Sequence, residues 1–140
     1  MVGTGTKEEQ ESLYRFIDGV GANDKYISLD EERDVVSKGA SLNIASPQAE
    51  AMLNHRCRRR KWTRESDITF YLRVLLEAAT KDDGQIDKKE FDQAITFAVA
   101  LRMPRKDALR ICCHMVREAK WQTKNEGLIR KVDWLSEYEK

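Results

Sequence analysis

Four carboxylates fall close together in the middle of the chain, and clustered carboxylate oxygens are the ligands that Ca²⁺ and Mg²⁺ take in proteins. Gly84 lies among them, where a calcium loop needs a residue with positive φ. When Gly84 is set at the sixth loop position, the first and third positions are Ala79 and Lys81, which carry no side-chain oxygen. The sequence therefore predicts weak divalent-cation binding rather than a tight calcium site. The candidate metal ligands are Asp82, Asp83, Asp87 and Glu90.

The same acidic residues also fit a purely structural role. Asp and Gly are typical of a turn between two helices, and Asp87 followed by Glu90 has the spacing of a helix-capping box. Ser28 and Glu31 have the same spacing earlier in the chain, after a turn in which Lys25 stands where the second turn has glycine. Cation binding and helix capping therefore both remain open for these turns.

A second candidate surface is a repeated row of three side chains on a predicted helix. Spacings of three and seven residues put a His, an Arg and a Trp in one row, away from the apolar face of the helix. Trp and Arg supply much of the energy of protein interfaces, so the rows predict a twofold docking surface. The alternative is that each Trp packs on the following helix with the Arg stacked on it. The rows are His55, Arg58 and Trp62, and His114, Arg117 and Trp121.

Six basic residues crowd the end of the first of these helices. Positive charge there suits the negative end of the helix dipole, but six charges exceed that need. The cluster therefore predicts a partner with an acidic surface, either a protein or a nucleic-acid backbone met through its phosphates. No nucleic-acid-binding motif supports the second version. The predicted partner-binding residues are His55, Arg56, Arg58, Arg59, Arg60, Lys61, Trp62, His114, Arg117 and Trp121, and Arg64 extends the basic cluster.

The residues that could carry catalysis do not form a recognisable site. Cys112, Cys113 and His114 are neighbours, and neighbours in a helix point about 100° apart, so they cannot converge on one metal ion. A Cys nucleophile also needs an oriented base, and no third group is identifiable. The chain has no phosphate loop, dinucleotide fingerprint or serine nucleophile elbow. We expect a protein that is not an enzyme and has no certain cofactor.

The elements that position these residues come in two aligned copies. A shift of 59 residues aligns residues 27–62 with 86–121 without a gap, and eight of the 36 pairs are identical. Each copy reads as three helices from its apolar spacing, its capping box and a proline near the start of the third helix, Pro47 or Pro104. Beyond the second copy, an apolar stripe predicts a closing helix at about 126–138. The stripe consists of Leu128, Ile129, Val132 and Leu135.

The predicted fold is therefore all-α, with no strand in the middle of the chain. It is a seven-helix orthogonal bundle of two tandem three-helix repeats, at about 8–62 and 66–121, plus the closing helix. A chain of 140 residues has the usual size of a single domain, so we expect one domain over residues 1–140.

Composition limits the classes of partner and the cellular compartment that we expect for this protein. Lys and Arg number 25 against 24 Asp and Glu, so no overall field favours nucleic acid or an anionic membrane. The longest apolar run, residues 94–101, is too short to span a membrane, and residues 1–10 lack the apolar stretch of a signal peptide. Three cysteines without a CxxC pair fit reduced thiols. We expect a cytoplasmic protein without membrane insertion.

Residues 71–119 resemble the tellurite-resistance TerB-like family. The resemblance rests on a helix ending Leu75-Leu76-Glu77-Ala78-Ala79, then Lys81-Asp82-Asp83-Gly84, Ile86-Asp87 and Glu90, followed by an alanine-rich apolar helix. It implies a duplicated all-helical bundle with acidic turns, linked to stress response and to binding of divalent metal or partner proteins. The implied residues are Asp82, Asp83, Asp87 and Glu90, with Asn23, Asp24 and Glu31 as counterparts; the first copy departs from the pattern at Lys25 and Tyr26.

The sequence thus predicts a non-enzymatic, TerB-like interaction module that binds divalent cations weakly at its acidic turns. One alternative is a calcium-responsive sensor of the EF-hand type. The other is a nucleic-acid-associated factor that uses the basic residues of segment 56–64.

Overall fold

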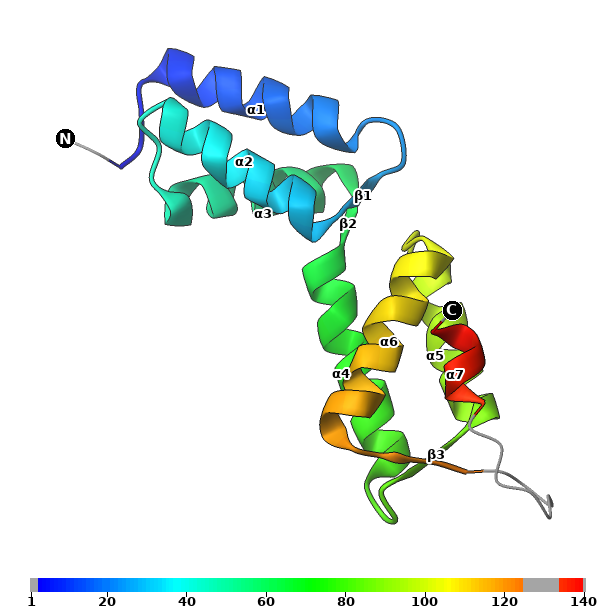
Figure 1. Cartoon of the computed structure of the whole chain (residues 1–140). Coiled ribbons are helices and arrows are strands. Elements are labelled where there is room, and N and C mark those ends of the chain that lie inside the picture. Colours follow the sequence, from blue (N-terminus) through cyan, green and yellow to red (C-terminus); the bar gives the residue numbers. More distant parts are fainter. Residues whose placement is uncertain (1–2, 125–133, 140) are drawn as a thin grey trace. The chain divides into compact units, whose positions relative to one another are not determined.

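The computed structural model describes residues 3–124 and 134–139 of the chain. The chain divides into two compact units, Met1–Ser66 and Asp67–Lys140 (Figure 1). Helices dominate both units, so the all-α class is confirmed. Among the residues described, no helix has the length and apolar character needed to cross a bilayer.

The first unit consists of three helices and one pair of short strands. Its core is formed by apolar side chains that all three helices and the first strand contribute, among them Leu13, Ile27 and Leu53. The strands pair in parallel, with Tyr26 opposite Thr63. The elements are α1 (Lys7–Gly21), β1 (Tyr26–Ile27), α2 (Leu29–Ser41), α3 (Ser46–Arg60) and β2 (Thr63–Arg64).

The second unit has the same order of elements with an added helical turn at its end. Its parallel strands pair Gln85 with Gln122. Phe91 is fully buried, and its ring lies 5.2 Å from that of Trp134 and 5.3 Å from that of Tyr138, so the last turn covers this part of the core. The elements are α4 (Glu65–Thr80), β3 (Gln85–Asp87), α5 (Lys88–Ala100), α6 (Arg105–Ala119), β4 (Gln122–Lys124) and α7 (Leu135–Tyr138).

The predicted helix starts are confirmed. Ser28 and Asp87 each accept a hydrogen bond from the backbone N–H of the residue three positions on, and the glutamate there accepts one in return, which satisfies two backbone donors at each helix start. The prolines stand at the starts of α3 and α6 as expected. A third capping box, between Thr6 and Glu9 at α1, escaped the sequence analysis.

Two features of the predicted fold need correction or restriction. The prediction that the middle of the chain contains no strand is wrong, because four short strands form two parallel pairs there. Sequence patterns missed them because two or three residues are too few to display an alternating pattern. Of the closing helix predicted at about 126–138, the structure describes only α7, a single turn that includes the buried Leu135. Residues 125–133, with Leu128, Ile129 and Val132 of the stripe, lie outside the described residues.

Candidate functional site

The strongest concentration of charge in the described residues is the basic end of α3, formed by Arg56, Arg58, Arg59, Arg60 and Lys61. Arg58, Arg59 and Arg60 lie on the last turn, where their positive charges face the partial negative charge of the helix C-terminus. The helix stops at Lys61, which adopts the left-handed conformation (φ 57°). The next residue, Trp62, donates its backbone N–H to the carbonyl of Cys57 at 2.9 Å, a hydrogen bond typical of this helix ending.

Two of the arginines are held in place by residues of α1. The Nε atoms of Arg56 and Arg60 lie 3.1 and 3.4 Å from Oδ1 of Asp18. The guanidinium of Arg56 also lies over the ring of Tyr14, 4.5 Å from its centroid, a favourable cation–π arrangement. The side chain of Arg56 is 18% exposed, so it fixes the end of α3 against α1 rather than pointing into solvent.

Arg58 and Arg59 are placed differently from their neighbours. Both side chains are exposed, and within the described part of the chain neither has a carboxylate partner. A guanidinium presents five N–H donors in a planar fork that matches a carboxylate. The basic end of α3 therefore displays two adjacent cations with unused hydrogen-bonding capacity, on a helix that the Asp18 contacts hold in position.

Trp62 packs within its own unit. Gly21, the last residue of α1, lies so close to the indole that a Cβ atom there would come within 2.4 Å of the ring atom Cζ3. The guanidinium of Arg60 lies 5.8 Å from the centre of the ring. The expectation was that Trp62 packs on the following helix with Arg58 stacked on it. The contacts that the structure gives for Trp62 are instead with the end of α1 and with Arg60.

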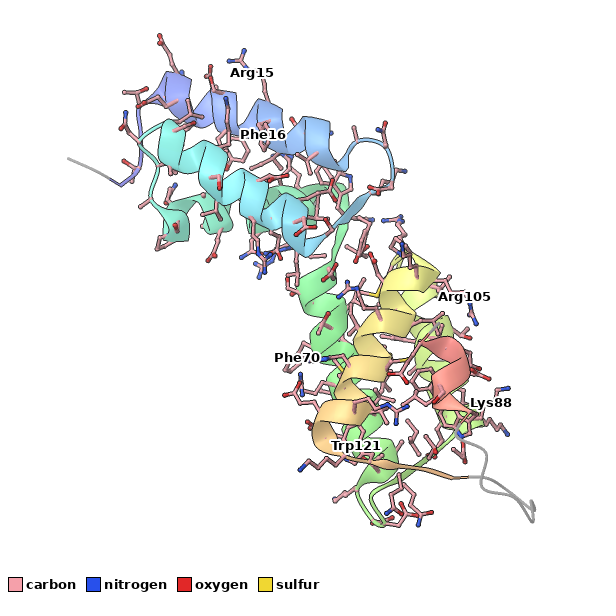
Figure 2. The ribbon with its side chains drawn as sticks, in the orientation of Figure 1. Arg15, Phe16, Phe70, Lys88, Arg105 and Trp121 are labelled. Atoms are coloured by element: carbon pink, nitrogen blue, oxygen red, sulfur yellow. The ribbon has the colours of Figure 1, made fainter. Side chains whose placement is uncertain are left out.

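The second row has other partners. His114 pairs with Glu118 at 2.9 Å, and Nη2 of Arg117 lies 2.6 Å from Oε1 of Glu139. Trp121, labelled in Figure 2 at the end of α6, is half-buried. In the first row, His55 instead faces the ring of Tyr14, with 6.5 Å between the ring centres. The two rows share residue types and spacing, but their surroundings differ.

One reason for the difference is the residue at the end of the first helix of each unit. The position aligned with Gly21 is Thr80, a buried residue whose hydroxyl donates to the carbonyl of Leu76 at 2.8 Å. In the first unit the indole of Trp62 packs against Gly21, which has no side chain. In the second unit the side chain of Thr80 occupies the equivalent space, so Trp121 cannot pack in the same position as Trp62.

The end of α6 is also much less basic than the end of α3. A shift of 59 residues aligns Arg59 with Glu118 and Arg60 with Ala119. The concentrated positive charge is therefore specific to the first unit and is not a requirement of the shared element order. The aligned residues at the end of α6 are Met115, Arg117, Glu118, Ala119 and Lys120.

The acidic turn before α5 uses most of its carboxylates locally. Asp83 accepts the backbone N–H of Gln85 at 3.0 Å, and Asp87 and Glu90 form the capping box of α5. Gly84 takes the left-handed conformation that was expected for it (φ 66°). In the described residues, no group of three or more Asp, Glu, His or Cys side chains is arranged to hold a metal ion.

The earlier turn has nearly the same geometry without a glycine. Lys25 adopts φ 56°, and Asp24 accepts the backbone N–H of Tyr26 at 3.2 Å, as Asp83 does in the second turn. Glu31 completes the capping box of α2 with Ser28. Asn23 is exposed in this turn, as Asp82 is in the other.

The cysteines are buried and poorly suited to nucleophilic chemistry. Burial raises the pKa of Cys112 to about 12 and the pKa of Cys113 to about 11, where Glu139 adds to the rise. A thiol with so high a pKa carries almost no reactive thiolate at neutral pH. The adjacent His114 points about 100° away from Cys113 along the helix wheel, is exposed, and pairs with Glu118.

Sequence reasoning missed Tyr14 and Asp18, the residues that hold the basic end of α3. They are four positions apart on α1 and therefore lie on the same face of that helix. This spacing was the available signal, but it does not specify which later helix the pair contacts.

Comparison with known proteins adds no identification. No family model, curated protein or solved structure matches the chain.

Proposed function

We propose that this chain is a non-enzymatic protein-binding module whose basic end of α3 docks on an acidic surface of a partner protein. The observation that carries the proposal is the exposed pair Arg58 and Arg59, adjacent cations without a carboxylate partner among the described residues. Arg is enriched in protein interfaces, and paired charges across an interface set specificity and speed association.

The surroundings of this pair favour a protein over a nucleic acid. Asp18 neutralises part of the positive charge of Arg56 and Arg60, which leaves fewer uncompensated cations than the several that a nucleic-acid backbone requires. Trp62 and the ring of Tyr14 offer apolar surface beside the charges, as interfaces between proteins do. The whole chain has a net charge of only +1, which gives no long-range attraction for a polyanion.

The proposal is tested with a fluorescent peptide of alternating glutamate and serine, titrated with the protein at low salt and followed by anisotropy. Reversing Arg58 and Arg59 together to Glu is expected to weaken binding by at least about tenfold, which corresponds to roughly 1.4 kcal/mol. The matched control reverses Arg105 and Lys106, an exposed basic pair at the start of α6, and lowers the net charge by the same four units. That control is expected to bind like the wild type.

Equal losses in the two double variants would overturn the proposal, because binding would then depend on net charge alone. A DNA duplex that binds more tightly than the peptide, and loses affinity on reversal of Arg58 and Arg59, would instead support the nucleic-acid-associated factor.

We also propose that the two units arose by duplication. What supports this is that positive φ recurs at a separation of 59 residues, at Lys25 and Gly84, Asn43 and Arg102, and Lys61 and Lys120. Helices α2 and α5 begin and end 59 residues apart, and so do α3 and α6. Left-handed residues are uncommon outside glycine, so coincidence at three positions is a stringent agreement.

The resemblance to the TerB-like family, with its link to stress response, stays a proposal. Its support is the helix, acidic turn and capped helix in residues 71–119. The resemblance implies weak cation binding at Asp82 and Asp83, whereas the alternative is a calcium sensor. The Ca²⁺ concentration at which Tm rises distinguishes the two. A sensor requires a saturable rise in Tm with micromolar Ca²⁺, whereas the turn as it stands predicts no rise below about millimolar Ca²⁺.

A further inference from the structure

Helix α4 carries a second apolar face that its own unit does not cover. Its buried face is formed by Ile68, Leu72 and Leu76, which recur every four residues. Phe70, Tyr71, Val74 and Leu75 lie outside that face and are 63, 51, 49 and 41% exposed. The rings of Phe70 and Tyr71 lie 5.9 Å apart, and Tyr71 reaches the ring of Phe97 on α5 at 6.4 Å. We call Phe70, Tyr71, Val74 and Leu75 the outer face of α4; Figure 2 shows Phe70 directed away from the unit.

The first unit shows that the fold does not require this apolar surface. The positions of α1 that align with Phe70, Tyr71 and Val74 are Glu11, Ser12 and Arg15. Figure 2 shows Arg15 projecting away from α1, at the position where α4 has Val74. Phe16, aligned with Leu75, is partly buried against the core of the first unit. The second unit thus exposes apolar side chains where the first has polar ones, and large exposed apolar patches mark interaction sites.

We infer that the outer face of α4 binds the same face of a second copy of this chain, with the two α4 helices antiparallel. The charges at the two ends of the face point to this occupant. Asp67, Val74 and Lys81 are seven residues apart, which places them nearly in line along the helix and the turn that continues it. Asp67 and Lys81 are both exposed, and in the described residues neither has an ion-pair partner.

The antiparallel arrangement makes this line self-complementary. With the twofold axis at Val74, each charge lies about 10 Å along the helix from the axis, because a helix rises about 1.5 Å per residue. Asp67 of each copy then faces Lys81 of the other, and Phe70 faces the small side chain of Ala78. A parallel pairing would set Asp67 against Asp67 and Lys81 against Lys81. An interface with twofold symmetry must complement itself in this way.

The area of the face suits a dimer of moderate affinity. Phe70 and Tyr71 each leave roughly 100 Å² in water, since aromatic side chains have about 150–250 Å² to bury. With Val74, Leu75 and the rim, two copies would bury on the order of 1,000 Å² in total, the lower bound for a specific interface. Because buried area alone does not set affinity, the dissociation constant has to be measured; we expect it in the micromolar range, at the weak end for interfaces.

The test is sedimentation velocity of the full chain from about 1 to 200 µM, with circular dichroism melts to show that each variant is folded. The wild type is expected to pass from monomer to dimer over this range. Val74→Arg places two like charges at the axis and is expected to weaken the dimer roughly a hundredfold. Arg15→Ala, at the aligned position on α1, is expected to leave the dimer unchanged.

Exchanging the charges of Asp67 and Lys81 distinguishes this specific interface from nonspecific hydrophobic association. Asp67→Lys and Lys81→Asp alone each set like charges together and are expected to weaken self-association. The double variant is expected to restore it, and a mixture of the two single variants is expected to form the heterodimer. A wild type that stays monomeric throughout, a dimer that tolerates Val74→Arg, or a double variant no better than the singles would each overturn the inference. Arg58 and Arg59 are not residues of this face, so reversing their charge is expected to leave the dimer unchanged. The dimer proposal and the acidic-partner proposal can therefore be refuted separately.

Discussion

At the scale of single residues, the contact between Gly21 and Trp62 fixes the residue that follows α3 against the end of α1. An indole lies where any side chain at position 21 would have to be, and the same indole lies beneath Arg60 of the basic end of α3. Glycine at this position is therefore required by packing. Its φ is not positive, so conformational freedom plays no part.

Gly21→Ala is expected to destabilise the protein by about 1–3 kcal/mol, because the added methyl overlaps three ring atoms at 2.4–2.8 Å. Gly19→Ala, two residues earlier on α1, is the matched control. No atom lies within 4 Å of its added Cβ, so it should stabilise the helix by about 0.5–1 kcal/mol. Urea unfolding followed by Trp fluorescence measures both. Equal effects of the two substitutions would contradict the packing of Trp62 on Gly21.

The buried thiols give a pH dependence with a definite sign. The pKa of Cys112 rises from its ordinary value of 9.0 to about 12 on burial. Below pH 9 the thiol is protonated in both states and stability is unaffected. Between pH 9 and 12 the unfolded state loses the proton first, so the free energy of unfolding falls as pH rises.

Cys112→Ala should therefore make the alkaline decline in stability shallower, as measured by urea unfolding at a series of pH values. Iodoacetamide at pH 8 should modify Cys112 and Cys113 rapidly only after unfolding. Rapid modification of the native protein would show that these thiols are accessible and that burial does not control their pKa.

At the scale of elements, local sequence signals were reliable where the interaction is local. Ser28 with Glu31 and Asp87 with Glu90 identified the starts of α2 and α5, since a capping box involves only residues three positions apart. The strands could not be found in this way. Thr63 pairs with Tyr26, 37 residues earlier, and nothing in two residues of sequence specifies such a distant partner.

The two acidic turns allow backbone strain to be measured directly. Lys25 and Gly84 occupy aligned positions with φ of 56° and 66°, a conformation that disfavours a side chain. Lys25→Gly should therefore stabilise the protein by roughly 0.5–1 kcal/mol, and Gly84→Ala should destabilise it by about 1 kcal/mol. An added Cβ at Gly84 meets no atom within 4 Å, so the second value reports φ rather than a clash. A loss of stability in Lys25→Gly would contradict this account and would indicate that the lysine side chain stabilises the turn. Thermal unfolding of both variants gives the answer.

At the scale of the whole molecule, two units of the same element order carry different surfaces. The first bears the basic end of α3, and the second bears the outer face of α4. The sequence was sufficient to predict the basic cluster, because six charges in ten residues exceed what a helix end requires. It was not sufficient to separate the anchored Arg56 and Arg60 from the outward Arg58 and Arg59, since that depends on Asp18 of another helix.

The repeated His, Arg and Trp row shows the limit of reasoning from internal symmetry. Identical residues at identical spacing predict equivalent surfaces. However, Thr80 stands where the first unit has Gly21, and its side chain prevents Trp121 from packing as Trp62 does. Arg117 is likewise paired with Glu139, close to the end of the chain. Such differences arise from contacts between elements, which spacing within one helix does not reveal.

The central claim, that the basic end of α3 receives an acidic partner, is tested most directly by nuclear magnetic resonance of the ¹⁵N-labelled chain titrated with the glutamate–serine peptide. The account predicts that the largest shift changes fall on the backbone amides of residues 56–61 and on the Nε–H groups of Arg58 and Arg59. The aligned residues 115–120 should stay nearly unchanged. Largest changes at 115–120, or changes spread evenly over both units, would contradict it.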